Sequence, residues 1–150
     1  MREAISEGYK AALKAGDKRR TATLRAVSAA IKDKDIEARG QGKGPLGEQD
    51  VLVLLQKMVK QREESLGIYE KAGREDLAVV EREEIAILSE FLPQGLSEAE
   101  VDAAIAAAIT KTGAQDAKDM GKVVASLKAD FPGRIDFGKA SAKIRSALGA

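Results

Sequence analysis

The chain has 150 residues, with 25 lysines and arginines against 24 aspartates and glutamates, and only 3% of its residues are aromatic. It holds no cysteine, histidine or tryptophan, which excludes thiol nucleophiles, imidazole bases, zinc–thiolate sites and the usual transition-metal ligands. No stretch approaches the roughly 18 apolar residues of a membrane span, and the chain does not start with the apolar run of a signal peptide. We therefore expect a cytoplasmic protein with no membrane contact.

Charge is distributed unevenly along the chain. Residues 10–34 hold eight lysines and arginines against two aspartates, and residues 111–150 hold eight against four acids, whereas residues 63–102 are mainly acidic. Such asymmetry steers an anionic partner towards one surface and away from another.

Apolar residues recur at three- and four-residue spacing and no alternating β-branched run is present, so the sequence predicts an all-α fold. We expect seven helices. The first stops near Gly16, the second follows the cap Asp17 and ends before Arg39-Gly40, and the others cover about 48–72, 75–91, 97–113, 116–130 and 136–148. The fourth helix is expected to expose Glu81, Arg82, Glu83 and Glu84 to water.

Pro93 and Gly95 interrupt the helical pattern, because proline cannot continue a helix and restricts the residue before it. Ser97 and Glu100 then form a capping box at the start of the next helix. The predicted division is an N-terminal domain of about four helices over residues 1–93 and a C-terminal three-helix bundle over residues 94–150.

Two stretches have the composition of a ligand site but are better explained without a ligand. The glycine-rich stretch 40–45 lacks the Gly-Lys-Ser/Thr ending of a P-loop and follows no strand, so a connector is the better interpretation than a phosphate cradle. Asp33, Asp35 and Glu37 come nearest to a Mg²⁺ site, but they alternate with lysines, and a solvated charged face explains them better. We expect no metal and no other cofactor.

The second helix begins with three cations, Lys18, Arg19 and Arg20, where the helix dipole already places positive partial charge. Free amides and cations at a helix start can bind phosphate. The alternative is that Asp17 offsets the cost and that Arg20 makes a structural ion pair. Lys18, Arg25 and Lys32 recur every seven residues on one face, which extends the positive charge of the helix start along the helix. Lys18, Arg19 and Arg25 are the candidate RNA-binding residues of this helix.

In the sixth predicted helix, Lys118 and Lys122 lie four residues apart with Gly121 between them. A helical glycine costs roughly 1 kcal/mol relative to alanine, so its presence suggests close approach of another group, and the two lysines favour an anion. The alternative is that Gly121 lets a neighbouring helix pack closely while the lysines are merely solvated.

Lys139 and Lys143 repeat this spacing in the last helix, where Gly138 precedes Lys139. The sixth and seventh helices could therefore present a shared basic edge. Because no aromatic residues are interleaved with these lysines, contacts to the phosphates and ribose of a folded RNA fit better than base stacking.

The chain closely resembles the free-standing YqeY-like members of the GatB/YqeY family. The matching segments are 16–20, 23–25, 56–65, 69–74, 90–93, 118–123 and 133–136, which read GDKRR, TLR, QKMVKQREES, YEKAGR, EFLP, KDMGKV and GRID. They occur in order over almost the whole length.

The resemblance implies an all-helical fold whose C-terminal part is similar to the tail of the B subunit of tRNA-dependent amidotransferases. Similar modules are appended to some glutaminyl-tRNA synthetases, where they recognise the outer corner of tRNA. The amidotransferase catalytic core lies outside the region that this chain shares with the family. The family label of carbon–nitrogen ligase with glutamine as amido donor therefore implies no such activity for this chain.

Our leading hypothesis is a non-catalytic tRNA-binding adaptor whose partners include tRNA and an aminoacyl-tRNA synthetase or amidotransferase. Its expected RNA contacts are Lys118, Gly121, Lys122, Lys139 and Lys143, with Lys18, Arg19 and Arg25 as a second contact. The rival hypothesis is a helical protein-interaction module that docks on a synthetase, an amidotransferase or a ribosomal protein. An enzyme of amide transfer is the least favoured interpretation.

Overall fold

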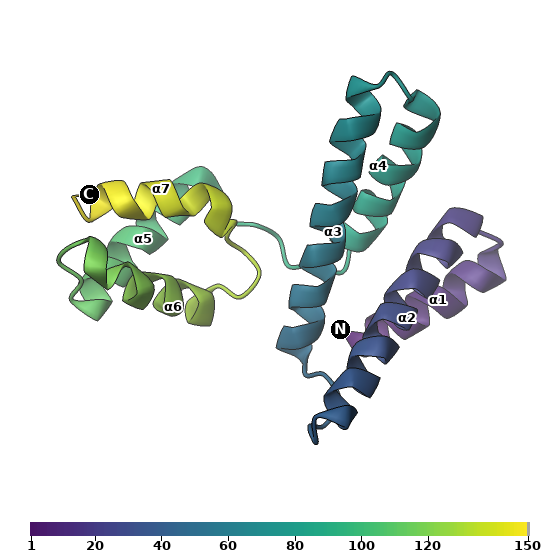
Figure 1. The fold of residues 1–150 in the computed structure, drawn as a ribbon, viewed down its shortest axis with the longest axis horizontal. Coiled ribbons are helices and arrows are strands. Elements are labelled where there is room, and N and C mark those ends of the chain that lie inside the picture. Colours follow the sequence, from purple (N-terminus) through teal and green to yellow (C-terminus); the bar gives the residue numbers. More distant parts are fainter. Residues whose placement is uncertain (150) are drawn as a thin grey trace. The chain divides into compact units, whose positions relative to one another are not determined.

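A computed structural model describes residues 1–149, and over that range all regular secondary structure is helical (Figure 1). The elements are α1 (Arg2–Ala15), α2 (Lys18–Gly40), α3 (Glu48–Lys71), α4 (Glu75–Ser89), α5 (Glu98–Thr112), a 3-10 turn (Ala117–Asp119), α6 (Met120–Asp130) and α7 (Phe137–Ala147). The predicted all-α fold is confirmed. In that range no helix is long and apolar enough to cross a membrane.

The chain separates into two compact units, Met1–Leu92 with α1 to α4 and Pro93–Ala150 with α5 to α7. Each unit has its own apolar core, built almost entirely from aliphatic side chains. The buried core of unit one contains Ile5, Val27, Ile31, Val51, Leu55, Met58 and Leu88. That of unit two contains Ala104, Ile105, Ala108, Val123, Leu127, Ile135, Ala140, Ile144 and Leu148.

In unit one, the whole apolar stripe predicted for α2 is buried. Leu24, Val27 and Ile31 are buried at three- and four-residue spacing, which is the pattern of one helix face. Helix α1 lies close to this face at Gly8, where an added Cβ would sit 3.2 Å from the Phe91 ring and 3.3 Å from Leu24. The absence of a side chain at Gly8 therefore permits the packing.

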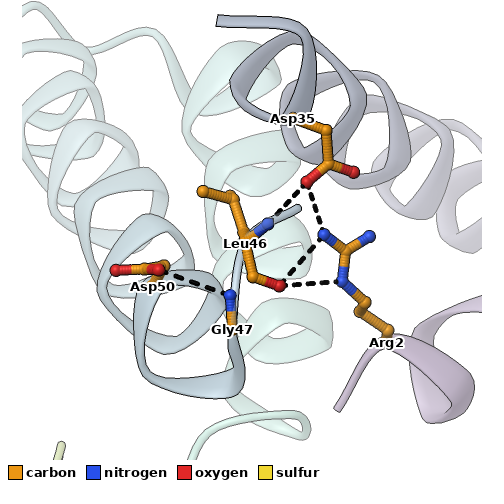
Figure 2. A network of polar contacts seen from close by, with 5 residues as sticks. All are labelled: Arg2, Asp35, Leu46, Gly47 and Asp50. Carbon is orange, nitrogen blue, oxygen red and sulfur yellow. Dashed lines mark hydrogen bonds and ion pairs between the residues drawn. The ribbon is translucent and has the colours of Figure 1, made fainter. Parts of the chain in front are cut away.

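The connection from α2 to α3 is fixed by one carboxylate, as Figure 2 shows. Asp35 Oδ1 accepts hydrogen bonds from Arg2 Nη2 at 2.5 Å and from the Leu46 amide at 2.9 Å. Arg2 Nε and Nη2 also donate to the Leu46 carbonyl, at 3.3 and 3.2 Å. The interpretation of Asp35 as part of a solvated face is wrong, because α1, α2 and the loop meet at this side chain, which is 21% exposed.

Helix α4 also differs from the sequence-based expectation. Glu84, which was expected to face water, accepts a 2.7 Å hydrogen bond from Arg62 Nε of α3, and both side chains are largely buried. Glu81 Oε2 is buried and makes no hydrogen bond within residues 1–149. Burial, followed by the nearby charge of Glu84, raises the pKa of Glu81. The tight pairing of α3 with α4 covers this side of the helix, which the local charge pattern did not indicate.

Unit two begins at the predicted capping box. Ser97 Oγ accepts from the Glu100 amide at 3.2 Å, and Glu100 Oε1 accepts from the Ser97 amide at 3.1 Å. Arg134 holds the segment before the capping box by two hydrogen bonds. Its carbonyl accepts from the Leu96 amide at 2.9 Å, and its Nε donates to the Gln94 carbonyl at 2.9 Å. Arg134 of the GRID segment thus has a structural role.

Replacing Asp35 by asparagine should lower the urea midpoint of unfolding at pH 7, because the charged acceptor of Arg2 is lost. The hydrogen bond from Arg2, followed by that from Leu46, lowers the pKa of Asp35. Its stabilising contribution is therefore complete above the unfolded-state pKa of about 3.9 and is lost as pH falls through the lower folded-state value. The difference between wild type and Asp35→Asn should shrink as pH falls from 7 towards 2.

The matched control is Asp33→Asn, since Asp33 is exposed and makes no ion pair within the described chain. It should leave the midpoint unchanged at each pH. A difference for Asp35→Asn that stays constant with pH would contradict the role of its charge.

Candidate nucleic-acid interface

Lys118 lies in the 3-10 turn Ala117–Asp119 rather than in the sixth helix, which begins at Met120 instead of near residue 116. Asp116 Oδ1 accepts from the Lys118 amide at 2.9 Å, and Asp119 Oδ2 accepts from the Gln115 amide at 2.9 Å. These side-chain acceptors stabilise a tight turn at this point. The prediction that Lys118 and Lys122 both lie in the sixth helix is therefore wrong.

Lys122 is in the first turn of α6. Its ammonium lies 3.5 Å from Asp119 Oδ1, and its side chain is 67% exposed. The hydrogen bond from the Gln115 amide, followed by the charge of Lys122, lowers the pKa of Asp119. A contact of this length on the surface contributes little stability and leaves the cation accessible to a stronger anion.

Gly121 has no packing role among the described residues. A Cβ built on it would meet no atom within 4 Å, and its backbone is ordinary helix without a positive φ. The interpretation in which Gly121 lets a neighbouring helix pack closely is therefore wrong. Close approach of an anion at Gly121 stays a prediction.

Helix α7 gives Gly138 a local explanation. Asp136 caps the helix by accepting the Gly138 amide at 2.9 Å, and a Cβ on Gly138 would lie 3.1 Å from the same carboxylate oxygen. Glycine therefore leaves room for the cap. Lys139, the next residue, is exposed and makes no ion pair within residues 1–149.

Lys143 differs from the other lysines of unit two because two carboxylates of α5 neutralise it. Its ammonium lies 2.9 Å from Asp102 Oδ1 and 3.4 Å from Glu98 Oε1. The hydrogen bond to Asp102, followed by that to Glu98, raises the pKa of Lys143. Its charge is used to join α7 to α5, which makes it the weakest candidate for a phosphate contact.

The lysines of α6 and α7 do not converge on one edge. Figure 1 shows the two helices running in opposite directions, so their N-terminal ends lie at opposite ends of unit two. Helix α6 has 11 residues, which corresponds to about 16 Å. Unit two therefore carries two cationic ends, one with Lys118 and Lys122 and one with Lys139, rather than a single basic edge.

On α2, most of the candidate cations have partners. Arg19 Nε donates to Glu83 Oε2 of α4 at 3.0 Å, and Arg20 pairs with Glu90 and lies over the Phe91 ring at 5.9 Å. Arg25 Nε donates to the Tyr9 hydroxyl at 3.3 Å. Lys18 is exposed and has no ion pair in residues 1–149. Of the three residues predicted for this contact, Lys18 is therefore the most available.

One electrostatic feature separates α2, α6 and α7 from the other helices. The first turns of α1, α3, α4 and α5 contain acids, whereas those of α2, α6 and α7 contain none. Those acid-free first turns hold cations instead, namely Lys18, Arg19, Arg20, Lys122 and Lys139. A cation there opposes the helix dipole, although the caps Asp17, Asp119 and Asp136 offset part of the cost. These helix starts are suited to an added anion.

The described residues offer no cluster of three or more acidic side chains that could hold a metal ion. The sequence-based candidates Asp33 and Glu37 flank Asp35, whose carboxylate is already bonded to Arg2 and Leu46.

One protein family and two named relatives match the chain. The sequence pattern of a family described as "Yqey-like protein" matches residues 2–148. A protein of Lachancea thermotolerans named "Altered inheritance of mitochondria protein 41, mitochondrial" is 33% identical over 109 residues, and a protein of Kluyveromyces lactis with the same name is 34% identical over 110 residues. Each match covers 71% of this chain and 57% of the relative.

Replacing Gly121 by alanine should stabilise the protein by about 0.5 kcal/mol, because the new Cβ enters open space and alanine is the better helix former. Gly8→Ala is the contrasting control. Its Cβ would press on Leu24, which is fully buried, so this variant should lose about 1 kcal/mol. Urea unfolding measures both changes. Loss of stability in Gly121→Ala would show that the glycine has a packing role.

Proposed function

Because this chain belongs to the YqeY-like protein family, we propose that it is a non-catalytic, cytoplasmic adaptor that binds tRNA. This is the GatB/YqeY family whose motifs run through the sequence. The proposed partners are tRNA and a protein that acts on it, an aminoacyl-tRNA synthetase or an amidotransferase. The two yeast relatives carry names that describe them as mitochondrial, so the cytoplasmic location is part of the proposal.

One observation carries the proposal. Unit two, the part that resembles the tail of the amidotransferase B subunit, starts both α6 and α7 with lysines and no first-turn acid. Lys118, Lys122 and Lys139 are exposed there, beside helix starts at which the helix dipole places positive partial charge. Such an arrangement costs stability in the free protein and is stabilised by a bound phosphate.

The separation of the two cationic ends supports a particular mode of binding. A distance of about 16 Å along α6 is too long for a single phosphate group, so the two ends would contact different parts of an RNA backbone. Unit two contains two phenylalanines, Phe131 and Phe137, and both pack against the core. Recognition would therefore rely on the shape and backbone of a folded RNA rather than on base stacking.

The rival hypothesis, a protein-docking module, is favoured by a different observation. On α3, the aliphatic side chains of Val53 and Ile68 are 54% and 65% exposed. They lie on the helix face that also carries Lys57, Lys60 and Lys71. A partner held by apolar contacts on this face would bind with little dependence on salt, whereas RNA binding weakens steeply as salt rises.

The triple variant Lys118→Gln, Lys122→Gln, Lys139→Gln should weaken binding of a tRNA transcript at least tenfold at 0.1 M salt. Three phosphate contacts would be lost, so the slope of log K against log salt should fall by about 2 to 3. Fluorescence anisotropy over a salt series measures both quantities.

The matched control is Lys57→Gln, Lys60→Gln, Lys71→Gln, which removes the same charge from exposed positions of α3 in unit one. It should bind tRNA as the wild type does. Equal loss in both variants would mean that binding depends on net charge alone, and no loss in the first variant would exclude unit two as the RNA site.

A further inference from the structure

An open pocket of about 260 Å³ between α1 and α2 is a second candidate site. Arg2 and Ser6 of α1 line it together with Ser28, Lys32 and Asp35 of α2, and Ile5 and Ile31 contribute apolar surface. The polar lining of the pocket consists of a guanidinium group, an ammonium group, two hydroxyls that can donate or accept, and one carboxylate.

Each of the donors has capacity to spare. Arg2 uses Nε and Nη2 on Asp35 and Leu46, and Nη1 makes no hydrogen bond within residues 1–149 (Figure 2). The ammonium of Lys32 likewise has no ion pair in that range, and its side chain is exposed. Arg2 and Asp35 form an ion pair with each other, so Lys32 supplies the unpaired charge of the pocket, and one guanidinium nitrogen of Arg2 can still donate.

The hydroxyl groups of Ser6 and Ser28 also belong to the pocket lining. The helical threonines Thr21, Thr23, Thr110 and Thr112 and one serine, Ser141, donate to the carbonyl four residues earlier. The other serines of the described helices make no such bond. Ser6 and Ser28 are among these serines, and both line the pocket. Two hydroxyls, a guanidinium nitrogen and an ammonium thus surround one open space, and a phosphate group provides the acceptor oxygens and the charge that they lack.

The pocket also continues a row of cations. Lys18, Arg25 and Lys32 follow one another at intervals of seven residues along α2, which places them on one face at a rise of about 10 Å per step. Lys32 is the member of this row that reaches the pocket. A ligand with repeated phosphates could lie along α2 and place one of them between the helices.

We propose that the pocket between α1 and α2 binds a phosphate group through Arg2, Ser6, Ser28 and Lys32. The phosphate belongs either to the backbone of a bound RNA or to a small phosphorylated molecule. The first case rests on the proposed function and gives unit one its own contact with RNA. The second case is independent of RNA binding.

The first experiment tests the pocket without RNA. Full-length ¹⁵N-labelled protein is titrated with inorganic phosphate and, separately, with AMP, while amide chemical shifts are followed. The amides of Ser6, Ser28 and Lys32 should shift and saturate, and the shifts should be lost in the double variant Ser6→Ala, Ser28→Ala. Ser89→Ala, on α4 and outside the pocket, is the matched control and should behave as the wild type.

The second experiment uses a tRNA transcript and the variant Lys32→Gln. If the pocket holds a backbone phosphate, affinity should fall about fivefold and the salt slope should drop by about 1. Lys10→Gln removes the same charge from an exposed position of α1 outside the pocket and should change neither quantity. Circular dichroism and thermal unfolding verify that all variants fold.

The outcomes separate the two sources. Saturable shifts with inorganic phosphate or AMP, with no effect of Lys32→Gln on tRNA affinity, assign the pocket to a small phosphorylated molecule. A specific effect of Lys32→Gln on tRNA affinity assigns it to the RNA backbone. If neither ligand shifts the three amides and Lys32→Gln binds tRNA as Lys10→Gln does, the proposal is overturned.

Failure of this inference is distinguishable from failure of the proposed function. If the wild type binds tRNA through the unit-two lysines while Lys32→Gln equals Lys10→Gln and no shift occurs, only the pocket is refuted. If the wild type binds no tRNA, the proposed function fails, and the titration with inorganic phosphate and AMP alone decides whether the pocket binds a phosphate group.

Discussion

The carboxylate of Asp35 is the interaction on which the arrangement of unit one depends. One of its oxygens accepts from Arg2 at the start of α1 and from the Leu46 amide at the end of the loop. This fixes where α3 begins, because Leu46 is followed by Gly47, whose amide is bonded to Asp50 Oδ2 at 3.3 Å. The same bonds hold Arg2 at the rim of the pocket between α1 and α2. A short polar network therefore holds the start of α3 against α1 and α2 and contributes to the charge of the pocket between α1 and α2.

The availability of the cations, rather than their number, distinguishes candidate binding residues from structural ones. Arg19, Arg20, Arg62 and Lys143 are paired with acids of neighbouring helices, so their charge joins one helix to another. Lys18, Lys32, Lys118 and Lys139 have no ion pair within residues 1–149, and all four are exposed. In a chain with a net charge of only +1, this separation leaves local positive regions that composition alone does not reveal.

Ion pairs between helices accompany the aliphatic cores. Aromatic residues make up 3% of the chain, so leucine, isoleucine, valine and alanine supply most of the buried surface. Helix α4 of unit one shows how the rest is arranged. It buries Ala78 and Leu88 and is further linked to α3 through Arg62 and Glu84 and to α2 through Arg19 and Glu83. Where apolar contact is limited, oriented charge pairs help to select one packing of the helices.

The sequence by itself determined which segments are helical and several of the helix ends, because these depend on neighbouring residues, whereas the 3-10 turn that delays α6 to Met120 was not predicted. The Ser97–Glu100 capping box, the cap Asp17 and the stop at Gly113 are local features, and each occurs where the pattern indicated. Tertiary structure decided the partners of the charged side chains. Nothing local to Asp35, Glu84 or Lys143 reveals that Arg2, Arg62 and Asp102 approach them, since these partners are 33, 22 and 41 residues away. The pocket lined by Ser6 and Ser28 could not be predicted for the same reason, because it exists only when two helices lie side by side.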